Sequence, residues 1–313
     1  MTLTQLSYMI AVAEAGNFTL AAENVFVTQP TLSMQIQKLE DELGVKIFNR
    51  SKKPIRLTTV GEQILTQARN IIAEAKRMED IVAQERGFIG GAFKLGIIPT
   101  VMPTLLPMFL THFIKKYPKV NLSIEEMNTK TIISHLKEGK LDAGIAATPL
   151  KIDNIEERPL YLEPFVAYLP HQHRLQGNNQ LSQDDLADER LLVLEDGHCF
   201  RDQALSLCRF NGQQKTDSFD LKSGSFETLI NLANEGLGMT LVPYLNSRNI
   251  PDEYQGNIRP FVSPPPAREI SLIFPKSQLK IQIIDALKQA IEGIIRGAIA
   301  IENVQIVSPY PKK

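Results

Sequence analysis

The chain has 313 residues, of which 43% are hydrophobic and 22% are charged, and its formal net charge is −1. This composition is typical of a folded protein, and the length predicts two or three domains. The near-neutral charge excludes a protein that coats nucleic acid with its whole surface, because such binding needs many cations to neutralise phosphates. Any contact with DNA is therefore expected to be local.

The start of the chain predicts a cytoplasmic protein without membrane contact. Residues 1–5 are not a basic segment followed by an apolar run, and no later stretch approaches the roughly 20 apolar residues that span a bilayer. Two cysteines, Cys199 and Cys208, are too few for a secreted disulfide framework. In a reducing compartment, a disulfide between them is expected to be a signal.

Three short helices are predicted first. Apolar residues recur at helical spacing in residues 3–15, 18–25 and 30–43. Residues 27–30 end the second helix and begin the third, since Pro30 restricts the residue before it and is tolerated in a first helical turn. Three helices with such a turn indicate a helix-turn-helix.

A basic hairpin is predicted next. Residues 45–58 alternate apolar and basic side chains around a turn at 52–54, without an acid. We interpret this segment as a wing, so that residues 1–58 form an all-α winged helix-turn-helix domain. The basic side chains of the wing are Lys46, Arg50, Lys52, Lys53 and Arg56.

A long linker helix is predicted over residues 59–87. A narrow apolar stripe on a charged helix favours a partner helix, so we expect a homodimer through it; packing on its own chain is the alternative. Glycines at positions 87, 90 and 91 predict a hinge. The stripe, at near-heptad spacing, is Ile64, Ala68, Ile71, Ile72, Ala75, Met78, Ile81 and Val82.

The rest of the chain alternates predicted strands with helices. Strands are expected at 93–98, 120–124, 143–146, 191–194, 240–242 and 270–274, and helices at 103–116, 131–138, 227–235 and 280–296. This alternation predicts an α/β domain over residues 88–301 with mainly parallel sheets. Residues 302–313 are expected to form a loosely held tail.

A DNA-contacting surface is predicted on the third helix and the wing. Short polar side chains opposite the apolar stripe can bond base edges or phosphates in the major groove. A merely solvated helix face is the alternative, and the adjoining basic wing favours DNA. The acids Glu40, Asp41 and Glu42 must point away from the DNA backbone. The expected contacts are Thr28, Gln29, Pro30, Thr31, Ser33, Gln37, Arg50, Lys52, Lys53 and Arg56.

Cys199 is predicted in the first turn of a helix, after a strand ending near Leu194 and a turn at Gly197. Exposed amides and the helix dipole favour a thiolate there. A protonated His198 adds to this effect, whereas Glu195 and Asp196 oppose it. Two buried packing cysteines are the alternative.

The spacing of the two cysteines restricts a disulfide. On a continuous helix, their separation places the sulfurs roughly 13 Å apart along the axis and on opposite faces, whereas a disulfide needs Cα atoms within roughly 7 Å. A disulfide would therefore require the helix to unwind and would act as a conformational switch, with residues 208–218 supplying slack.

Residues 18–22, 27–33, 36–44 and 57–61 resemble the winged helix-turn-helix of LysR-type transcriptional regulators. The resemblance covers nearly the whole chain. It implies double-stranded promoter DNA as partner, a linker helix that dimerises, and a two-lobed effector domain similar to periplasmic binding proteins. A homotetramer on DNA and a contact with RNA polymerase are also expected.

Residues 194–199, 201–204 and Cys208 are similar to the redox segment of the hydrogen peroxide sensors in this family. This resemblance implies an activator of the oxidative-stress response without a cofactor. Cys199 would be the peroxidatic cysteine, oxidised to a sulfenic acid, and Cys208 the resolving cysteine that closes a disulfide. A cellular thiol reductant would reset the switch.

Further matches at residues 97–101, 128–129 and 267–270 imply a peroxide pocket. Phe200, Ala267 and the chain beyond residue 300 depart from the family pattern. Thr100 and Thr129 have the alternative roles of a helix cap and a turn residue. Arg268 has the alternative role of an ordinary surface or salt-bridge residue. The pocket residues implied are Thr100, Thr129, His198, Asp202 and Arg268.

Three other functions are weighed. A regulator of this family could sense a metabolite between the two lobes, at residues 236–240 and Thr100. A thiol peroxidase is disfavoured because the chain has no Cys-x-x-Cys pair and a DNA-binding module would be superfluous, so no enzyme is expected. A zinc site at His198, Cys199 and Cys208 lacks paired spacing and a fourth ligand, so no metal is expected.

Overall fold

The computed structural model describes the chain except residues 53, 86–88, 188, 209–222, 300–302 and 310–313, and except the side chains of 73, 76–77 and 79–85. The predicted contact Lys53, the hinge glycine at 87 and the stripe residues Ile81 and Val82 therefore lie outside the described residues or side chains. The described part forms two compact units, which divide between residues 88 and 89.

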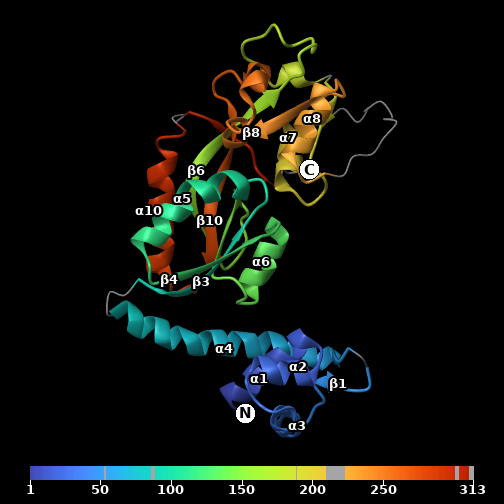
Figure 1. Ribbon diagram of the computed structural model, residues 1–313, viewed down its shortest axis with the longest axis vertical. Coiled ribbons are helices and arrows are strands. Elements are labelled where there is room, and N and C mark those ends of the chain that lie inside the picture. Colours follow the sequence, from blue (N-terminus) through green and yellow to red (C-terminus); the bar gives the residue numbers. More distant parts are fainter. Residues whose placement is uncertain (53, 86–88, 188, 209–222, 300–302, 310–313) are drawn as a thin grey trace. The chain divides into compact units, whose positions relative to one another are not determined.

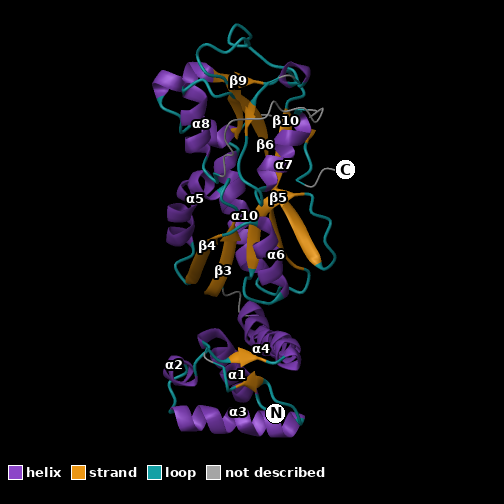
Figure 2. Cartoon of the chain, turned by 90° about the vertical axis from the view of Figure 1, so that its right-hand side faces the viewer, coloured by secondary structure: helices purple, strands orange, loops and turns teal. Residues whose placement is uncertain are grey.

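The first unit begins with the predicted helices α1 (Leu3–Ala15), α2 (Phe18–Asn24) and α3 (Gln29–Leu43). Side chains cap all three starts: the Thr2, Asn17 and Thr28 oxygens accept backbone N–H groups of the first turns. Gly16 and Gly44 end α1 and α3 in the left-handed conformation, at φ 60° and 68°. Figure 2 shows the three helices of this unit. Their shared apolar core includes Met9, Val12, Leu32, Ile36 and Leu39.

The turn between α2 and α3 holds Phe26 in an unusual state. Its φ is 57°, a left-handed value that bulky residues rarely adopt, and its side chain is 95% exposed. The predicted wing is a short antiparallel hairpin of β1 (Phe48–Asn49) and β2 (Arg56–Leu57). The long helix α4 (Thr59–Glu85) follows, as predicted.

The second unit contains one large sheet with the strand order β4-β3-β5-β10-β6-β8-β7. The first lobe comprises β3 (Gly91–Ile97), β4 (Val120–Glu126), β5 (Ala143–Thr148), α5 (Met102–Lys116), α6 (Thr129–Lys137) and α10 (Ile281–Ile295). The second comprises β7 (Leu191–Leu192), β8 (Met239–Pro243), β9 (Ile258–Pro260), α7 (Cys199–Leu207) and α8 (Phe226–Asn234). Separate apolar clusters form the cores of the lobes. The predicted two-lobed α/β fold is confirmed.

Two long strands join the lobes (Figure 1). β6 (Ile155–Tyr168) pairs with β10 (Pro266–Pro275) over its first part and with β8 and β9 over its last. A short helix α9 (Tyr244–Ser247) follows β8. β6 was not predicted, and the prediction of mainly parallel sheets was wrong. The sheet is mixed, because β10 runs antiparallel to β5 and β6, and β6 runs antiparallel to β8.

The tail also differs from its prediction. β11 (Gln305–Ile306) pairs in parallel with β10, and the Val307 N–H donates to the Ala267 carbonyl at 2.8 Å. Val307 itself is buried, at 9% exposed. Residues 305–307 are therefore part of the second unit and not a loose end, because the edge of β10 offers them backbone partners.

Candidate redox site and DNA-contacting surface

Cys199 is the first residue of α7, as predicted. Gly197 turns the chain at φ 98°, and His198 precedes the helix in an extended conformation. Arg201 fixes this loop from the helix side, since its guanidinium donates to the Leu194 carbonyl at 2.9 Å and pairs with Asp196 at 3.0 Å. The Cys199 side chain therefore lies where the amides of a helix start favour a thiolate.

The Cys199 thiol faces the other lobe. Its Sγ lies 3.0 Å from Oγ1 of Thr129, the first residue of α6. Cys199 is 9% exposed and Thr129 is 2% exposed. The contact thus joins the starts of two helices that belong to different lobes, in a position largely closed to water.

Arg268 on β10 brings Thr100 to the same region. Its Nη1 donates to Thr100 Oγ1 at 2.8 Å and its Nη2 to the Thr100 carbonyl at 3.0 Å. The guanidinium carbon also lies 5.3 Å from the ring centre of Phe200, the neighbour of Cys199 in α7. Arg268 is only 1% exposed, so it is a buried cation and not a surface residue.

The sequence reasoning missed the partner of this cation. Glu163 on β6 stands directly opposite Arg268 in the sheet register. Its Oε2 accepts hydrogen bonds from Arg268 Nη2 at 2.8 Å and Nε at 3.0 Å, and its Oε1 accepts the Leu245 N–H at 3.0 Å. The signal that could have found Glu163 is an acid inside the apolar run of residues 160–169.

Tyr161 lies near this ion pair, two residues before Glu163 on the same strand. Among the described residues its buried hydroxyl has no hydrogen-bond partner. Burial raises the pKa of Tyr161 well above its ordinary value, the Glu163 carboxylate raises it further, and Arg268 lowers it. The tyrosine is therefore neutral at physiological pH.

Two predicted pocket residues point elsewhere. His198 is largely buried, with its Nε2 4.0 Å from Glu195 Oε1, and a Cβ atom on Gly224 would lie only 3.1 Å from that nitrogen. Asp202 is exposed on α7. The structure thus gathers Thr100, Thr129 and Arg268 around the start of α7 by direct contacts, whereas His198 contacts the loop before the helix and Asp202 faces solvent.

Cys208 ends α7 in the apolar core of the second lobe. It is 3% exposed, and burial raises the pKa of its thiol to about 12. The two cysteines are not joined in a disulfide, and the uninterrupted helix Cys199–Leu207 lies between them. The segment expected to supply slack, residues 209–218, lies outside the described residues.

The predicted DNA contacts at the start of α3 are accessible. Thr28, Gln29, Pro30 and Thr31 are exposed, while Ser33 and Gln37 are half-buried. The Thr28 hydroxyl caps the helix by accepting the Thr31 N–H at 3.4 Å. Gln37 donates to Asp41 Oδ1 at 2.6 Å. In the wing, Lys52 and Arg56 are exposed.

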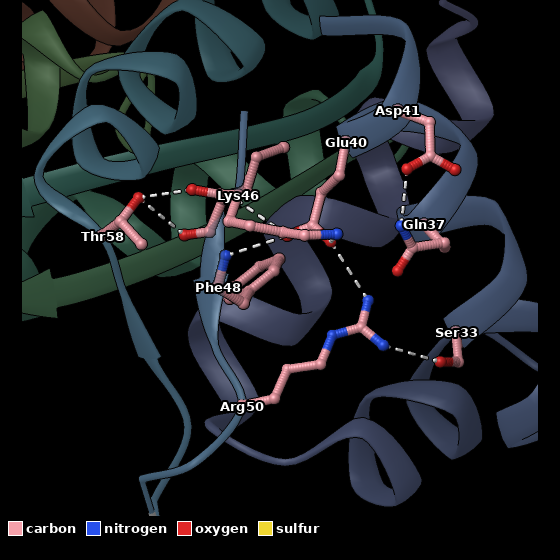
Figure 3. A network of polar contacts seen from close by, with 9 residues as sticks. Ser33, Gln37, Glu40, Asp41, Lys46, Phe48, Arg50 and Thr58 are labelled. Atoms are coloured by element: carbon pink, nitrogen blue, oxygen red, sulfur yellow. Dashed lines mark hydrogen bonds and ion pairs between the residues drawn. The ribbon is translucent and has the colours of Figure 1, made fainter. Parts of the chain in front are cut away.

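Arg50 is anchored to the core of the first unit (Figure 3). Its Nη2 lies 3.3 Å from Glu40 Oε2, and its Nη1 donates to Ser33 Oγ at 3.4 Å. The other Glu40 oxygen accepts the backbone N–H groups of Ile47 at 2.8 Å and Phe48 at 3.1 Å. Glu40 therefore points inward and fixes the start of the wing, a role that the sequence analysis did not identify.

A separate cleft of about 610 Å³ lies between the lobes. Its lining does not include Thr100 or residues 236–240, where a metabolite was considered. Among its lining residues are Pro99, Pro103, Glu126, Phe226, Asn231 and Tyr254. Within the described part of the chain, no cluster of three metal-ligating side chains occurs, and no helix has the length and apolarity to cross a membrane.

Comparison with known families now places the chain. The model described as "Bacterial regulatory helix-turn-helix protein, lysR family" matches residues 3–62, and the "LysR substrate binding domain" matches residues 86–293. The chain therefore belongs to the LysR family of bacterial regulators, which bind DNA through this domain. Within the family, it is most readily compared with proteins named OxyR or hydrogen peroxide-inducible genes activator.

Three comparisons illustrate this. The "Hydrogen peroxide-inducible genes activator" of Pectobacterium carotovorum is 35% identical, covering 94% of this chain and 98% of that protein. The full-length OxyR of Pseudomonas aeruginosa, solved with a cysteine replaced by aspartate, is 34% identical with a TM-score of 0.76, over 93% of this chain and 98% of that one. A peroxide-bound cysteine-to-serine variant of Corynebacterium glutamicum OxyR is 29% identical with a TM-score of 0.64, over 97% of both chains.

Proposed function

We propose that this chain is a cytoplasmic transcriptional activator that senses hydrogen peroxide through Cys199. The observation that carries the proposal is the 3.0 Å contact of the Cys199 thiol with Thr129, in a buried region that also holds Arg268 and Thr100. The similar proteins named above support it: one is called a hydrogen peroxide-inducible genes activator, and another binds hydrogen peroxide.

The first step is the attack of the Cys199 thiolate on one peroxide oxygen. A sulfur–oxygen bond forms as the O–O bond breaks, so the sulfur is oxidised to a sulfenic acid and the second oxygen leaves as hydroxide. The hydroxide takes up the proton that the thiol released on ionisation and becomes water. The hydroxyls of Thr100 and Thr129 hydrogen-bond the peroxide, and the Arg268 cation stabilises the negative charge that develops on the leaving oxygen. His198 and Asp202, which the resemblance also implied, take no part in this step, because His198 lies against the loop before α7 and Asp202 faces solvent.

The second step joins the cysteines. The Cys208 sulfur attacks the sulfenic sulfur, a disulfide forms, and the hydroxyl leaves as water with the Cys208 proton. Because a helix of this length separates the sulfurs by roughly 13 Å, α7 must unwind first. A cellular thiol reductant reverses the reaction by thiol–disulfide exchange.

The output of the switch is DNA binding. We propose that the start of α3 enters the major groove while Arg50, Lys52, Lys53 and Arg56 contact phosphates. The exposed apolar residues Ile71 and Met78 on α4, at 39% and 66%, support a homodimer through this helix. Two dimers form a homotetramer on promoter DNA, where oxidation changes the spacing of the winged helices and thereby the contact with RNA polymerase.

The test treats the pure reduced protein with stoichiometric hydrogen peroxide and follows its mass and free thiols. The expected wild-type result is a rapid loss of two hydrogens. Cys208→Ser is expected to accumulate a sulfenic acid, and Cys199→Ser to stay reduced. Unchanged thiols at micromolar peroxide contradict the proposal.

The inter-lobe cleft supports a second candidate, a regulator that binds a small metabolite. Its lining combines apolar rings with the side chains of Glu126 and Asn231, which suits a ligand with polar groups. Should the thiols fail to react, a screen of metabolites for an increase in the unfolding temperature is the experiment that tests this candidate.

A further inference from the structure

The buried ion pair of Glu163 and Arg268 contains a carboxylate, that of Glu163, to which the proposed chemistry gives no role. Each side chain is only 1% exposed. A guanidinium removed from water is tolerated only when its charge is compensated and its N–H groups are bonded. Glu163 supplies the charge, and its second oxygen is held by the Leu245 N–H of α9. The carboxylate is therefore fixed from a separate element.

This fixed carboxylate determines where Arg268 points. Two of the guanidinium nitrogens, Nε and Nη2, donate to the same Glu163 oxygen. Since the guanidinium is planar and rigid, binding one edge directs the remaining donors. Nη1 then reaches Thr100 Oγ1. Nη2 also donates to the Thr100 carbonyl at 3.0 Å, whereas Glu163 is the one acceptor described for Nε.

The pair also limits the electric field at the thiol. Opposite charges 2.8 Å apart act on a more distant group as a dipole, which is weaker than an isolated cation. Loss of the carboxylate charge would expose Cys199 to the full cation and favour its thiolate. The other ionisable side chains close to Cys199 along the chain are His198, Arg201 and Asp202. Glu195 lies beside His198, and Asp196 pairs with Arg201.

We propose that Glu163 is a positioning residue for the peroxide reaction, which holds Arg268 against Thr100 and weakens the positive field at Cys199. The inference rests on the proposed function. It assigns two separable roles to one carboxylate: its oxygens orient the guanidinium, and its charge sets how readily the thiol ionises.

Two substitutions separate these roles in a full-length Cys208→Ser background, where Cys199 is the only thiol. Glu163→Gln keeps an acceptor oxygen but removes the charge, so the pH midpoint of Cys199 alkylation is expected to fall by half a unit or more. Glu163→Ala removes both, and the rate of sulfenic acid formation with hydrogen peroxide is expected to fall at least tenfold. Parental alkylation profiles and oxidation rates in both variants would overturn the proposal.

A matched control is Tyr161→Phe on the same strand, which removes a buried hydroxyl without a described partner. It is expected to leave both readouts unchanged. Thermal unfolding establishes which variants are folded. If Glu163→Ala does not fold, Glu163→Gln alone tests the proposal. An unshifted pH midpoint of Cys199 alkylation in Glu163→Gln then overturns the proposal. The alkylation measurement needs no peroxide. If the Cys208→Ser parent does not react with peroxide, the proposed function is contradicted, but the pH midpoint of Cys199 alkylation still tests the role of Glu163.

Discussion

Each unit of the molecule contains a glutamate–arginine pair, and the two pairs differ in how far the arginine side chain is exposed to solvent. In the first unit, the Glu40 side chain is fully buried but that of Arg50 is 40% exposed. In the second, both Glu163 and Arg268 are 1% exposed. The same two residue types therefore leave a cation at the surface of the first unit in one case and enclose a cation near the start of α7 in the other.

The sharpest test of this contrast is the removal of the enclosed cation. Arg268→Met leaves the buried Glu163 carboxylate without its counter-charge, which is expected to destabilise the second unit by about 3–5 kcal/mol. The matched control is Arg158→Met, whose side chain is 27% exposed in its pair with Asp285 and whose loss is expected to cost about 0–1 kcal/mol. The midpoints of urea unfolding measure the loss of stability in both variants. Equal midpoints for Arg268→Met and Arg158→Met would contradict the expected difference.

The acid of the first unit is expected to matter nearly as much. Glu40→Ala leaves the buried N–H groups of Ile47 and Phe48 without acceptors, at an expected cost of about 3 kcal/mol. Thermal unfolding monitored by helical signal measures this loss. Glu23→Ala, on the exposed face of α2, is the control and should melt like the wild type. A wild-type melting curve for Glu40→Ala would show that the wing needs no such anchor.

The exposed arginine should behave in the opposite way to Arg268. Arg50→Met is expected to change the unfolding free energy by about 1 kcal/mol or less, because Glu40 keeps its backbone donors. Its affinity for duplex DNA is expected to fall about tenfold, with the salt dependence reduced by about one phosphate contact. Fluorescence anisotropy titrations at several salt concentrations measure this. Lys151→Met, in the other unit, is the control.

Burial in the second unit also predicts a pH effect. Burial raises the pKa of the Cys208 thiol to about 12 in the folded protein, from 9.0 for an exposed thiol. The unfolded chain therefore loses this proton first, and stability falls as pH rises from about 9 towards 12, with a loss on the order of 1 kcal/mol at pH 10. Comparing unfolding midpoints of wild type and Cys208→Ser at pH 8 and 10 tests this. Parallel behaviour of the two proteins would contradict it.

The smallest expected effect concerns an exposed side chain with a strained backbone. Phe26→Asn places a residue that tolerates φ 57° in the turn before α3, and is expected to stabilise the first unit by about 1 kcal/mol. Leu20→Asn, at a helical position that is 48% exposed, is the control and should not stabilise. Differential scanning calorimetry distinguishes the two variants. A melting temperature of Phe26→Asn below that of the wild type would contradict the inferred backbone strain at Phe26.

The sequence predicted what local pattern determines. Periodicity located α1, α3, α5 and α10, and the turn at Gly197 placed Cys199 at the start of α7. It did not reveal β6, because Pro159 and Pro164 interrupt the strand pattern and four of its first nine residues are charged. Prolines and charges are tolerated there since β6 joins two lobes and carries half of a buried ion pair.

Long-range pairing accounts for the other omissions. Glu163 and Arg268 are 105 residues apart, and Arg50 reaches the buried carboxylate of Glu40 only after the chain has turned into the wing. No local window of sequence contains both Glu163 and Arg268. The resemblance to a family supplied Thr100, Thr129 and Arg268, but the acid that orients Arg268 became evident only in three dimensions.

The C-terminal segment of the chain is hydrogen-bonded to the helix that separates the two cysteines. Gln203, midway between the cysteines in α7, donates to the Val307 carbonyl at 2.7 Å, and β11 pairs with the strand that carries Arg268. An α7 that unwinds must move Gln203 and release this bond. A fluorophore attached at the end of the chain would then report disulfide formation by its change in mobility, without any label on a cysteine.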